Sequence, residues 1–450
     1  MTATTNLESN NTISPSFPYA KLLSAKSVDT RIDDLSKHSL IVRNHETHDV
    51  FSDSAGHINH LSHHYLAAYS LGASMDKLQT IYDVYASYMR PRPPSIGVLT
   101  DKTYQQHLGN RDAYTSYLEY FTKEIEHRGM LDAIRFWMFH DNEKDNMLPR
   151  VLGSGIHPLI HLGYAVEFNL PLIAAESLSM AASSEDTLKH FFAAAAPPAV
   201  PNQQASATCS IKDIVAKVNC DPAFDGIVKF TDKIKVLSVL ASAHKAGSKI
   251  SEYVAQWSIK DLKSSLQELY TQVMLLYAST GIRGNSSQSP KIDFFLAHCL
   301  TSIHAAHTLL PYLTPLQAEW LLRGHLATTL VCYIGCGRPQ VQPESLVKYE
   351  GTNIKSLTSL SAVPDASDDD TSKTKWHEVI KRSLAPEIQE PHYIKVVRAL
   401  ALGQVVFDDP PSLKDVWLKA AQLTMDVAER SAGEISGWDF AGIGFDETWQ

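Results

Sequence analysis

Residues 155–168 read GIHPLIHLGYAVEF, and this stretch decides how the surrounding chain is interpreted. Proline is favoured in the first turn of a helix, so Pro158 marks a helix start. The apolar residues that follow recur at the three- and four-residue spacing of one helical face. His157 and His161 are four residues apart and share a face of that helix. The stretch therefore predicts a buried helix that carries histidines.

The same helical spacing of apolar residues recurs along most of the chain, whereas the two-residue alternation of half-buried strands is scarce. The sequence therefore predicts an all-α fold: a single large multi-helix domain, with or without two lobes, around a central histidine-lined pocket. The expected helices cover residues 58–71, 75–88, 112–127, 129–140, 158–181, 225–244, 260–279, 291–310, 315–332, 374–383, 391–402 and 412–431.

Three segments have the composition of connections rather than of packed helices. Residues 1–18 are rich in Ser, Thr and Asn, which predicts a disordered tail ahead of a catalytic domain at 19–450. Residues 182–222 contain paired prolines and an Asn-Gln-Gln run, which predicts a loop-rich insertion with one short helix inside. Residues 358–373 hold three successive aspartates and predict an acidic, exposed connector.

The composition restricts the classes of function. The net charge of -9 and the absence of a Lys/Arg run argue against nucleic acid as a partner. No apolar run is long enough to span a bilayer, and the N-terminal residues lack a secretory signal, so we expect a cytoplasmic protein without a membrane partner. The chain has no GxGxxG and no GxxxxGK[ST], so no Rossmann-bound flavin or nicotinamide is expected. Nothing in the sequence indicates the oligomeric state.

Histidine is the unusual component of this chain, with 20 copies, and ten of them gather in four segments. In the first segment, His60 and His64 would share a face if 60–71 is helical, and two imidazoles one turn apart can reach one metal ion. In the second, His161 lies on the apolar face of its helix beyond His157. A buried imidazole without a partner costs about 1–3 kcal/mol, and a metal ion or a nearby glutamate would supply that partner.

The other two segments also carry polar groups within apolar sequence. His298 lies between FFLA and CL, so its helix should bury it, while His304 and His307 are expected nearer the rim. His392 and Lys395 are three residues apart on a helix that begins at a proline, and they face the same way. Burial lowers the pKa of a lysine, and the neutral amine can react with carbon dioxide to give a carbamate, an anionic oxygen ligand.

Each of these groups also has an ordinary interpretation. A single histidine can cap a helix or donate to a core carbonyl, and a lysine can extend to the surface and pair with a carboxylate. Four segments that each offer an inward histidine favour one shared metal ion. Imidazole-rich sites suit Zn, Cu, Fe and Ni, and an added carboxylate-type oxygen favours iron. Glu167 and Glu176 are candidate acid–base groups or hydrogen-bond partners of the histidines.

Four motifs, in this order, resemble the questin oxidase family, which includes Baeyer–Villiger-type oxidases of fungal polyketide pathways. The resemblance spans roughly residues 40–430. The motifs are NHLxHHxL at 59–66, GxHPxIHLGYxxE at 155–167, FxxHxxT at 295–301 and HxxKVVRAL at 392–400.

The resemblance implies an oxygenase that uses O2 to cleave a C–C bond of an anthraquinone-type polyketide ring at a non-haem iron. Lys395 and Glu167 are the expected catalytic residues. The expected metal ligands are His60 or His64, His161 with His157 as the second choice, His298, His392, and Lys395 as its carbamate. NADPH is a candidate cosubstrate, and no flavin is expected. The alternatives are an NADPH-dependent Baeyer–Villiger monooxygenase without bound metal, a metal-dependent hydrolase, and a non-catalytic helical scaffold.

Overall fold

A computed structural model describes the fold of residue 22 and of residues 39–139, 147–192, 209–283, 288–351 and 368–450. Within these ranges the chain is mainly α-helical, which confirms the expected fold class. The expected tail at 1–18 lies outside the described residues. The longer helices are α1 (Leu40–Thr47), α2 (Leu61–Ser70), α3 (Met75–Ala86), α4 (Tyr114–Arg128), α5 (Met130–Phe139), α7 (His157–Glu167), α8 (Pro171–Ser183), α10 (Ile211–Cys220), α11 (Lys235–Ala241), α12 (Ala243–Ala255), α13 (Leu262–Ser279), α14 (Phe294–Leu309), α15 (Pro315–Gly335), α18 (Asp368–Ser383), α19 (Pro391–Phe407) and α20 (Val416–Arg430).

Shorter elements connect them. These are α6 (Leu148–Val151), α9 (Lys189–Phe192), α16 (Pro343–Val347) and several single-turn 3-10 helices. In the described part of the chain, the strands β1 (Ile292–Asp293) and β2 (Trp438–Asp439) form the sheet; they pair in parallel, with Ile292 opposite Trp438. None of the helices in these ranges combines the length and apolarity of a membrane span.

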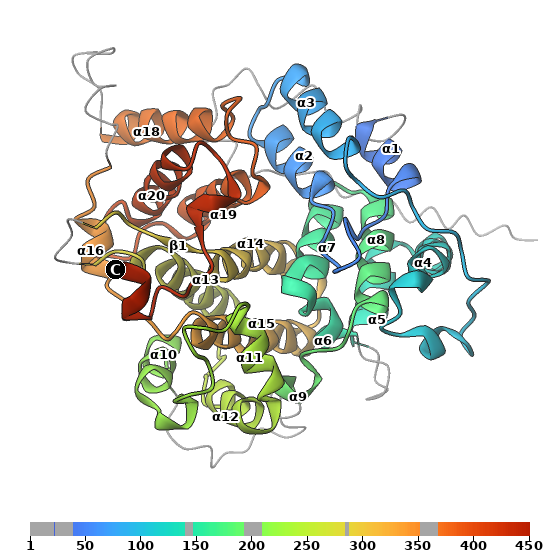
Figure 1. Cartoon of the computed structure of the whole chain (residues 1–450), viewed down its shortest axis with the longest axis horizontal. Helices are drawn as coiled ribbons and strands as arrows, with labels where there is room; N and C mark the ends of the chain where they lie inside the picture. The colour runs from blue at the N-terminus through green and yellow to red at the C-terminus, as the bar shows by residue number, and fades with distance from the viewer. Residues whose placement is uncertain (1–21, 23–38, 140–146, 193–208, 284–287, 352–367) are drawn as a thin grey trace, which may run out of the picture.

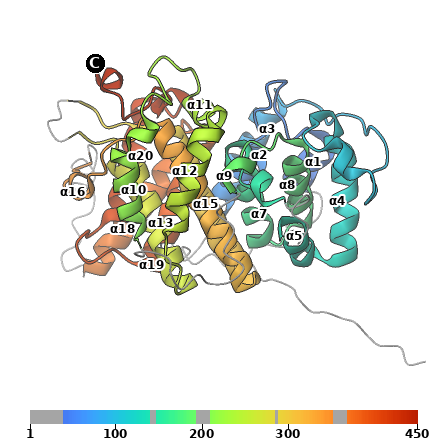
Figure 2. The same ribbon diagram turned by 90° about the horizontal axis from the view of Figure 1, so that it is seen from below.

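The helices form two groups that lie side by side (Figures 1 and 2). Helices α1 to α8 make one group, and α10 to α20 make the other. The groups meet where α7 packs on α14 and where α2 packs on α19. Their buried apolar side chains belong to one continuous core, so the two groups are parts of a single domain.

Close helix contact at the centre depends on small residues. A Cβ added to Gly163 of α7 would overlap the Cβ of Ala305 in α14, so glycine lets the two backbones approach. The start of α14 is fixed by Asp293, whose carboxylate accepts hydrogen bonds from the backbone N–H groups of Phe295 (2.9 Å) and Leu296 (2.8 Å). These contacts determine where the histidines of α7 and α14 lie relative to each other.

The expected helix at 158–181 is two helices in the structure. The chain breaks at Asn169, which has a φ of 53°, and Pro171 starts α8. The expected helix at 225–244 is wrong in its first half, because α11 begins only at Lys235. The acidic residues from Asp368 onward, expected in a connector, begin α18.

Candidate metal centre

Four histidines from four separate segments bring their Nε2 atoms together at the contact between the two helix groups. His60 directly precedes α2, His157 begins α7, His298 lies one turn into α14, and His392 lies at the start of α19. Their ligating nitrogens lie within 4.8 Å of one another. The Nε2 atom of His157 lies 2.9 Å from that of His60 and 3.3 Å from that of His298, which in turn lies 3.1 Å from Nε2 of His392.

The outer nitrogen of each ring is held by a hydrogen-bond acceptor. A carbonyl or carboxylate oxygen only accepts, so each Nδ1 must carry the proton. The acceptors are the backbone oxygens of Ile58 (2.7 Å), Ser154 (2.6 Å) and Phe294 (2.8 Å) for His60, His157 and His298, and the Glu390 carboxylate for His392. In the neutral rings, Nε2 is then an unprotonated lone pair, so the Nε2···Nε2 contacts are not hydrogen bonds.

Four lone pairs that face each other in a buried site fit a cation. Imidazole nitrogens bind metals at roughly 2.0–2.1 Å, so ligands at right angles around one ion are about 3 Å apart. The observed Nε2 separations of 2.9, 3.1 and 3.3 Å match this value. Burial, together with the neighbouring positive groups, holds the pKa of all four rings well below the ordinary value. They therefore stay neutral, which is the form that binds metal.

Lys395 lies one turn after His392 and is buried beside the histidines. Among the described residues, its Nζ has no hydrogen-bond partner. Burial lowers the pKa of Lys395 to about 7, against the opposing effect of the Glu390 carboxylate. A substantial fraction of the amine is therefore neutral at physiological pH.

A comparison with known proteins supports the family resemblance that the four histidine motifs indicated. Residues 57–400 match the family described as questin oxidase-like. The chain belongs to the questin oxidase-like family. A "Questin oxidase" of Aspergillus terreus is 27% identical in an alignment of 439 residues that covers 91% of this chain and 91% of that protein.

Two further relatives have similar coverage. The "Baeyer-Villiger oxidase AgnL3" of Paecilomyces divaricatus is 26% identical over 91% of this chain and 89% of its own length. The "Oxidoreductase AflY" of Aspergillus parasiticus is 26% identical over 94% of this chain and 84% of its own length. The match therefore extends over nearly the whole of this questin oxidase-like chain.

A left-handed turn positions His157 in this questin oxidase-like protein. Ser154, Gly155 and Ile156 have φ values of 48°, 64° and 66°. Such backbone is costly for residues with a side chain and is found mainly at functional sites. A Cβ on Gly155 would lie 3.0 Å from Nδ1 of His157, so glycine also leaves room for the ring.

Glu390 is a site residue that sequence reasoning missed. Its carboxylate accepts from the His392 ring, from the His392 backbone N–H (2.9 Å) and from Nε1 of Trp438 (2.8 Å). Burial raises the pKa of Glu390 to about 7. The signal was present in the sequence, because an acidic residue directly before Pro391 is a typical helix cap.

His64 does not join the four histidines, although its backbone N–H donates to the carbonyl of His60 four residues earlier. Helix α2 begins at Leu61, and His60 is its cap residue. His64 is buried near Tyr85, with 6.0 Å between the ring centroids. Burial lowers its pKa to about 3.

His161 and Glu167, which were expected at the metal and in catalysis, also lie apart from the four histidines. His161 contacts His63 and Glu176 instead. Glu167 pairs with Arg398 and with Nε2 of His304 (3.4 Å). Burial alone would raise the pKa of Glu167, but these two partners outweigh it and hold the pKa at about 2.

Proposed function

We propose that this protein uses O2 to open a ring of an anthraquinone-type aromatic polyketide at a metal centre held by His60, His157, His298 and His392. The convergence of their four unprotonated Nε2 atoms carries the proposal. The proposed reaction and substrate class are supported by the family and by relatives named questin oxidase and Baeyer–Villiger oxidase.

We propose iron as the metal and the carbamate of Lys395 as an oxygen ligand. Iron is favoured by several imidazoles combined with one carboxylate-type oxygen. The buried Nζ of Lys395, which lacks a hydrogen-bond partner in the described chain, supports this role. Bound iron would supply Lewis acidity and electrons for the activation of O2.

The chain itself would orient the ligands and receive the flat substrate. The Nδ1 hydrogen bonds of the four rings fix their tautomer and direction. The Phe294 ring lies 4.6 Å from His298, 4.7 Å from His392 and 4.6 Å from Phe440, between ring centroids. Phe440 is 41% exposed. These two phenylalanines offer an aromatic surface, from solvent to the histidines, on which polyketide rings could stack.

Two oxygen stoichiometries are chemically distinct. If both atoms of O2 enter the product, no external reductant is required. If one atom enters and the other becomes water, two electrons must come from a reductant such as NADPH. We propose the first. The second is favoured by a relative named "Baeyer-Villiger monooxygenase dmxR6" from Cryptosporiopsis sp..

The proposal is tested by assaying purified protein with hydroxyanthraquinones under air and under nitrogen, before and after treatment with a chelator. We expect a ring-opened product only under air, loss of activity after chelation, and recovery with Fe(II). With ¹⁸O2, both labelled atoms should appear in the product without NADPH. Product formation under nitrogen would indicate a hydrolase and contradict the proposal. Activity that survives complete metal removal would contradict the metal centre.

A further inference from the structure

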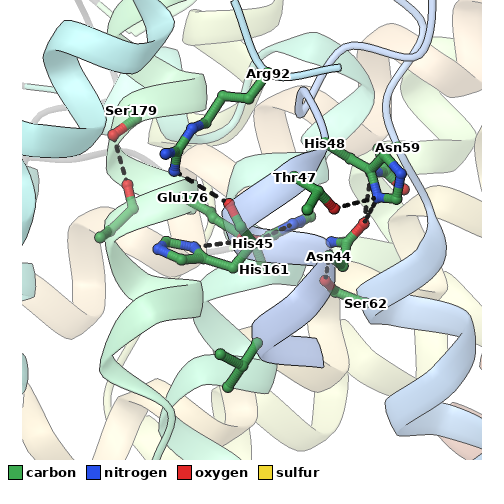
Figure 3. A network of polar contacts seen from close by, with 12 residues as sticks. Asn44, His45, Thr47, His48, Asn59, Ser62, Arg92, His161, Glu176 and Ser179 are labelled. Atoms are coloured by element: carbon green, nitrogen blue, oxygen red, sulfur yellow. Dashed lines mark hydrogen bonds and ion pairs between the residues drawn. The ribbon is translucent and has the colours of Figure 1, made fainter. Parts of the chain in front are cut away.

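A second set of histidines forms a chain of contacts beside the metal-site candidate. Nε2 of His63 is hydrogen-bonded to Nδ1 of His161, and Nε2 of His161 lies 3.6 Å from Oε2 of Glu176. The other oxygen of Glu176 lies 2.9 Å from Nδ1 of His45 (Figure 3). His63, His161 and Glu176 are buried, and the His45 side chain is 18% exposed.

The carboxylate at one end fixes the protons along this chain. Burial alone would raise the pKa of Glu176, but the close contact with His161 and the hydrogen bond from His45 hold it at about 2, so the group is ionised. An ionised carboxylate only accepts, so Nε2 of His161 carries a proton and its Nδ1 does not. His63 must then donate through Nε2.

This assignment leaves Nδ1 of His63 as an unprotonated lone pair. Nδ1 has no hydrogen-bond partner among the residues that the structure describes. His63 therefore has the opposite tautomer to His60, which lies three residues earlier and is protonated on Nδ1.

The His63 ring lies next to the four histidines. It stacks on Tyr164 with 5.3 Å between centroids and an interplanar angle of 21°. Its plane is parallel to that of His157, with 6.1 Å between centroids. An unprotonated ring nitrogen, oriented by a buried carboxylate through a second imidazole, thus lies beside the proposed metal ligands. In many enzymes, a third group orients the base in the same way.

We propose that His63 is a catalytic base that removes a proton from a phenolic hydroxyl of the substrate, with His161 and Glu176 as positioning residues. The inference rests on the proposed function for its substrate class. The substrate O–H bond breaks, its electron pair stays on the oxygen, and the proton bonds to Nδ1 of His63. The Nε2 proton of His63 moves to Nδ1 of His161. The positive charge then lies on His161, beside the carboxylate of Glu176.

The test is a spectroscopic titration under nitrogen, which needs no turnover. Hydroxyanthraquinones absorb at longer wavelength when a phenol ionises. We expect iron-loaded wild-type protein to bind a dihydroxyanthraquinone as its phenolate. His63→Phe, which preserves a ring against Tyr164, should bind it as the neutral phenol, and Glu176→Gln should give an intermediate spectrum. The matched control is His64→Phe, the next residue of α2, which should behave as the wild type.

Turnover gives a second measurement. General base catalysis contributes roughly 10²–10⁴-fold, so kcat of His63→Phe should fall by about this factor with KM and iron content nearly unchanged. The base proposal is overturned if the wild type binds no phenolate, if His63→Phe retains it, or if that variant loses its iron. If the phenolate forms as expected but no O2 is consumed, the proposed function fails and the base assignment stands.

Discussion

The same three helices, α7, α14 and α19, carry two polar groups with opposite character. At their starts lie His157, His298 and His392, which together with His60 make the four-histidine cluster. Further along the same helices lie Glu167, His304 and Arg398, which make the ion network. In the ion network, the carboxylate of Glu167 neutralises Arg398 and contacts His304.

The ion network and the four-histidine cluster differ in the hydrogen-bond donors and charged groups that they contain. The ion network contains both a carboxylate and a guanidinium, so its buried groups satisfy one another. The four rings of the histidine cluster direct their protons outward to carbonyl and carboxylate oxygens, so each ring presents only a lone pair to the inside. Buried histidines by themselves therefore do not indicate a metal site. Several imidazole rings that all direct unprotonated nitrogens toward one another do indicate one.

The sharpest test of this comparison replaces one histidine of α14 in each group. His298→Ala should lose the bound metal. Its activity should fall by more than the roughly 10–100-fold that is lost when a hydrogen-bond partner of a metal ligand is mutated. His304→Ala, on the same helix, should retain the metal. Elemental analysis of both purified variants measures this. Equal metal content in the two would remove the distinction between the groups.

Breaking the ion network should affect stability rather than metal binding. Glu167→Gln leaves the buried Arg398 without its carboxylate, and we expect the free energy of unfolding to fall by about 3–5 kcal/mol. The exposed pair Asp132–Arg135 is the control, and Asp132→Asn should cost less than about 1 kcal/mol. Chemical denaturation of metal-loaded protein gives both values. Loss of metal from folded Glu167→Gln would instead place Glu167 in the site.

The stability difference between the wild type and Glu167→Gln should depend on pH, because the pKa of the Glu167 carboxyl changes on folding. The pKa of Glu167 is lowered from 4.5 to about 2 by Arg398 and His304 against the effect of burial. Its stabilising contribution is therefore complete above the unfolded value and is lost as the pH falls toward 2. The gap in unfolding free energy between wild type and Glu167→Gln should shrink between pH 6 and pH 3. A gap that widens on acidification would contradict this assignment.

The carboxylate of Glu390 accepts a hydrogen bond from Nδ1 of His392, on the outer side of the four-histidine cluster. Glu390→Gln replaces the anionic acceptor of the His392 Nδ1–H by a neutral amide, so metal affinity should fall roughly 10–100-fold. Competition with a chelator measures the affinity. Because Glu390 also caps α19, unfolding should be measured in parallel, where a cost near 1 kcal/mol is expected. An unchanged affinity would show that the carboxylate serves the helix alone.

The smallest expected effect on metal affinity comes from the contact of α7 with α14, where the two helix groups meet. Gly163→Ala forces a methyl group against Ala305 and should cost about 1–3 kcal/mol of unfolding free energy. Metal affinity should fall only a few-fold, because His157 and His298 are moved slightly apart. Adding Ala305→Gly should recover part of the stability. If stability recovers fully and metal affinity does not, the α7–α14 contact would not be the common cause of both losses.

Much of the fold could be predicted from the sequence, because most helices bury an apolar face and so repeat at helical spacing. The helices near 58–71, 291–310 and 391–402 were located in this way. The break at Asn169 was missed because apolar residues continue on both sides of it. In such a stretch, a local backbone reversal leaves little trace in the periodicity.

The candidate site could be located by segment but not by residue. The motifs placed His298 and His392 among the rings that converge in the structure, but they left His60 against His64 undecided and favoured His161 over His157. That choice depends on the first residue of α2 and on the left-handed turn before α7. It also depends on which backbone oxygen accepts each Nδ1 proton, and these oxygens become available only in the folded chain.

X-ray absorption of the purified wild-type protein at the iron edge shows whether the four histidines hold iron. We expect about one iron per chain, with nitrogen ligands at roughly 2.1 Å and the outer scattering of several imidazoles. An active protein without a transition metal, or an iron bound without imidazole, would contradict this expectation.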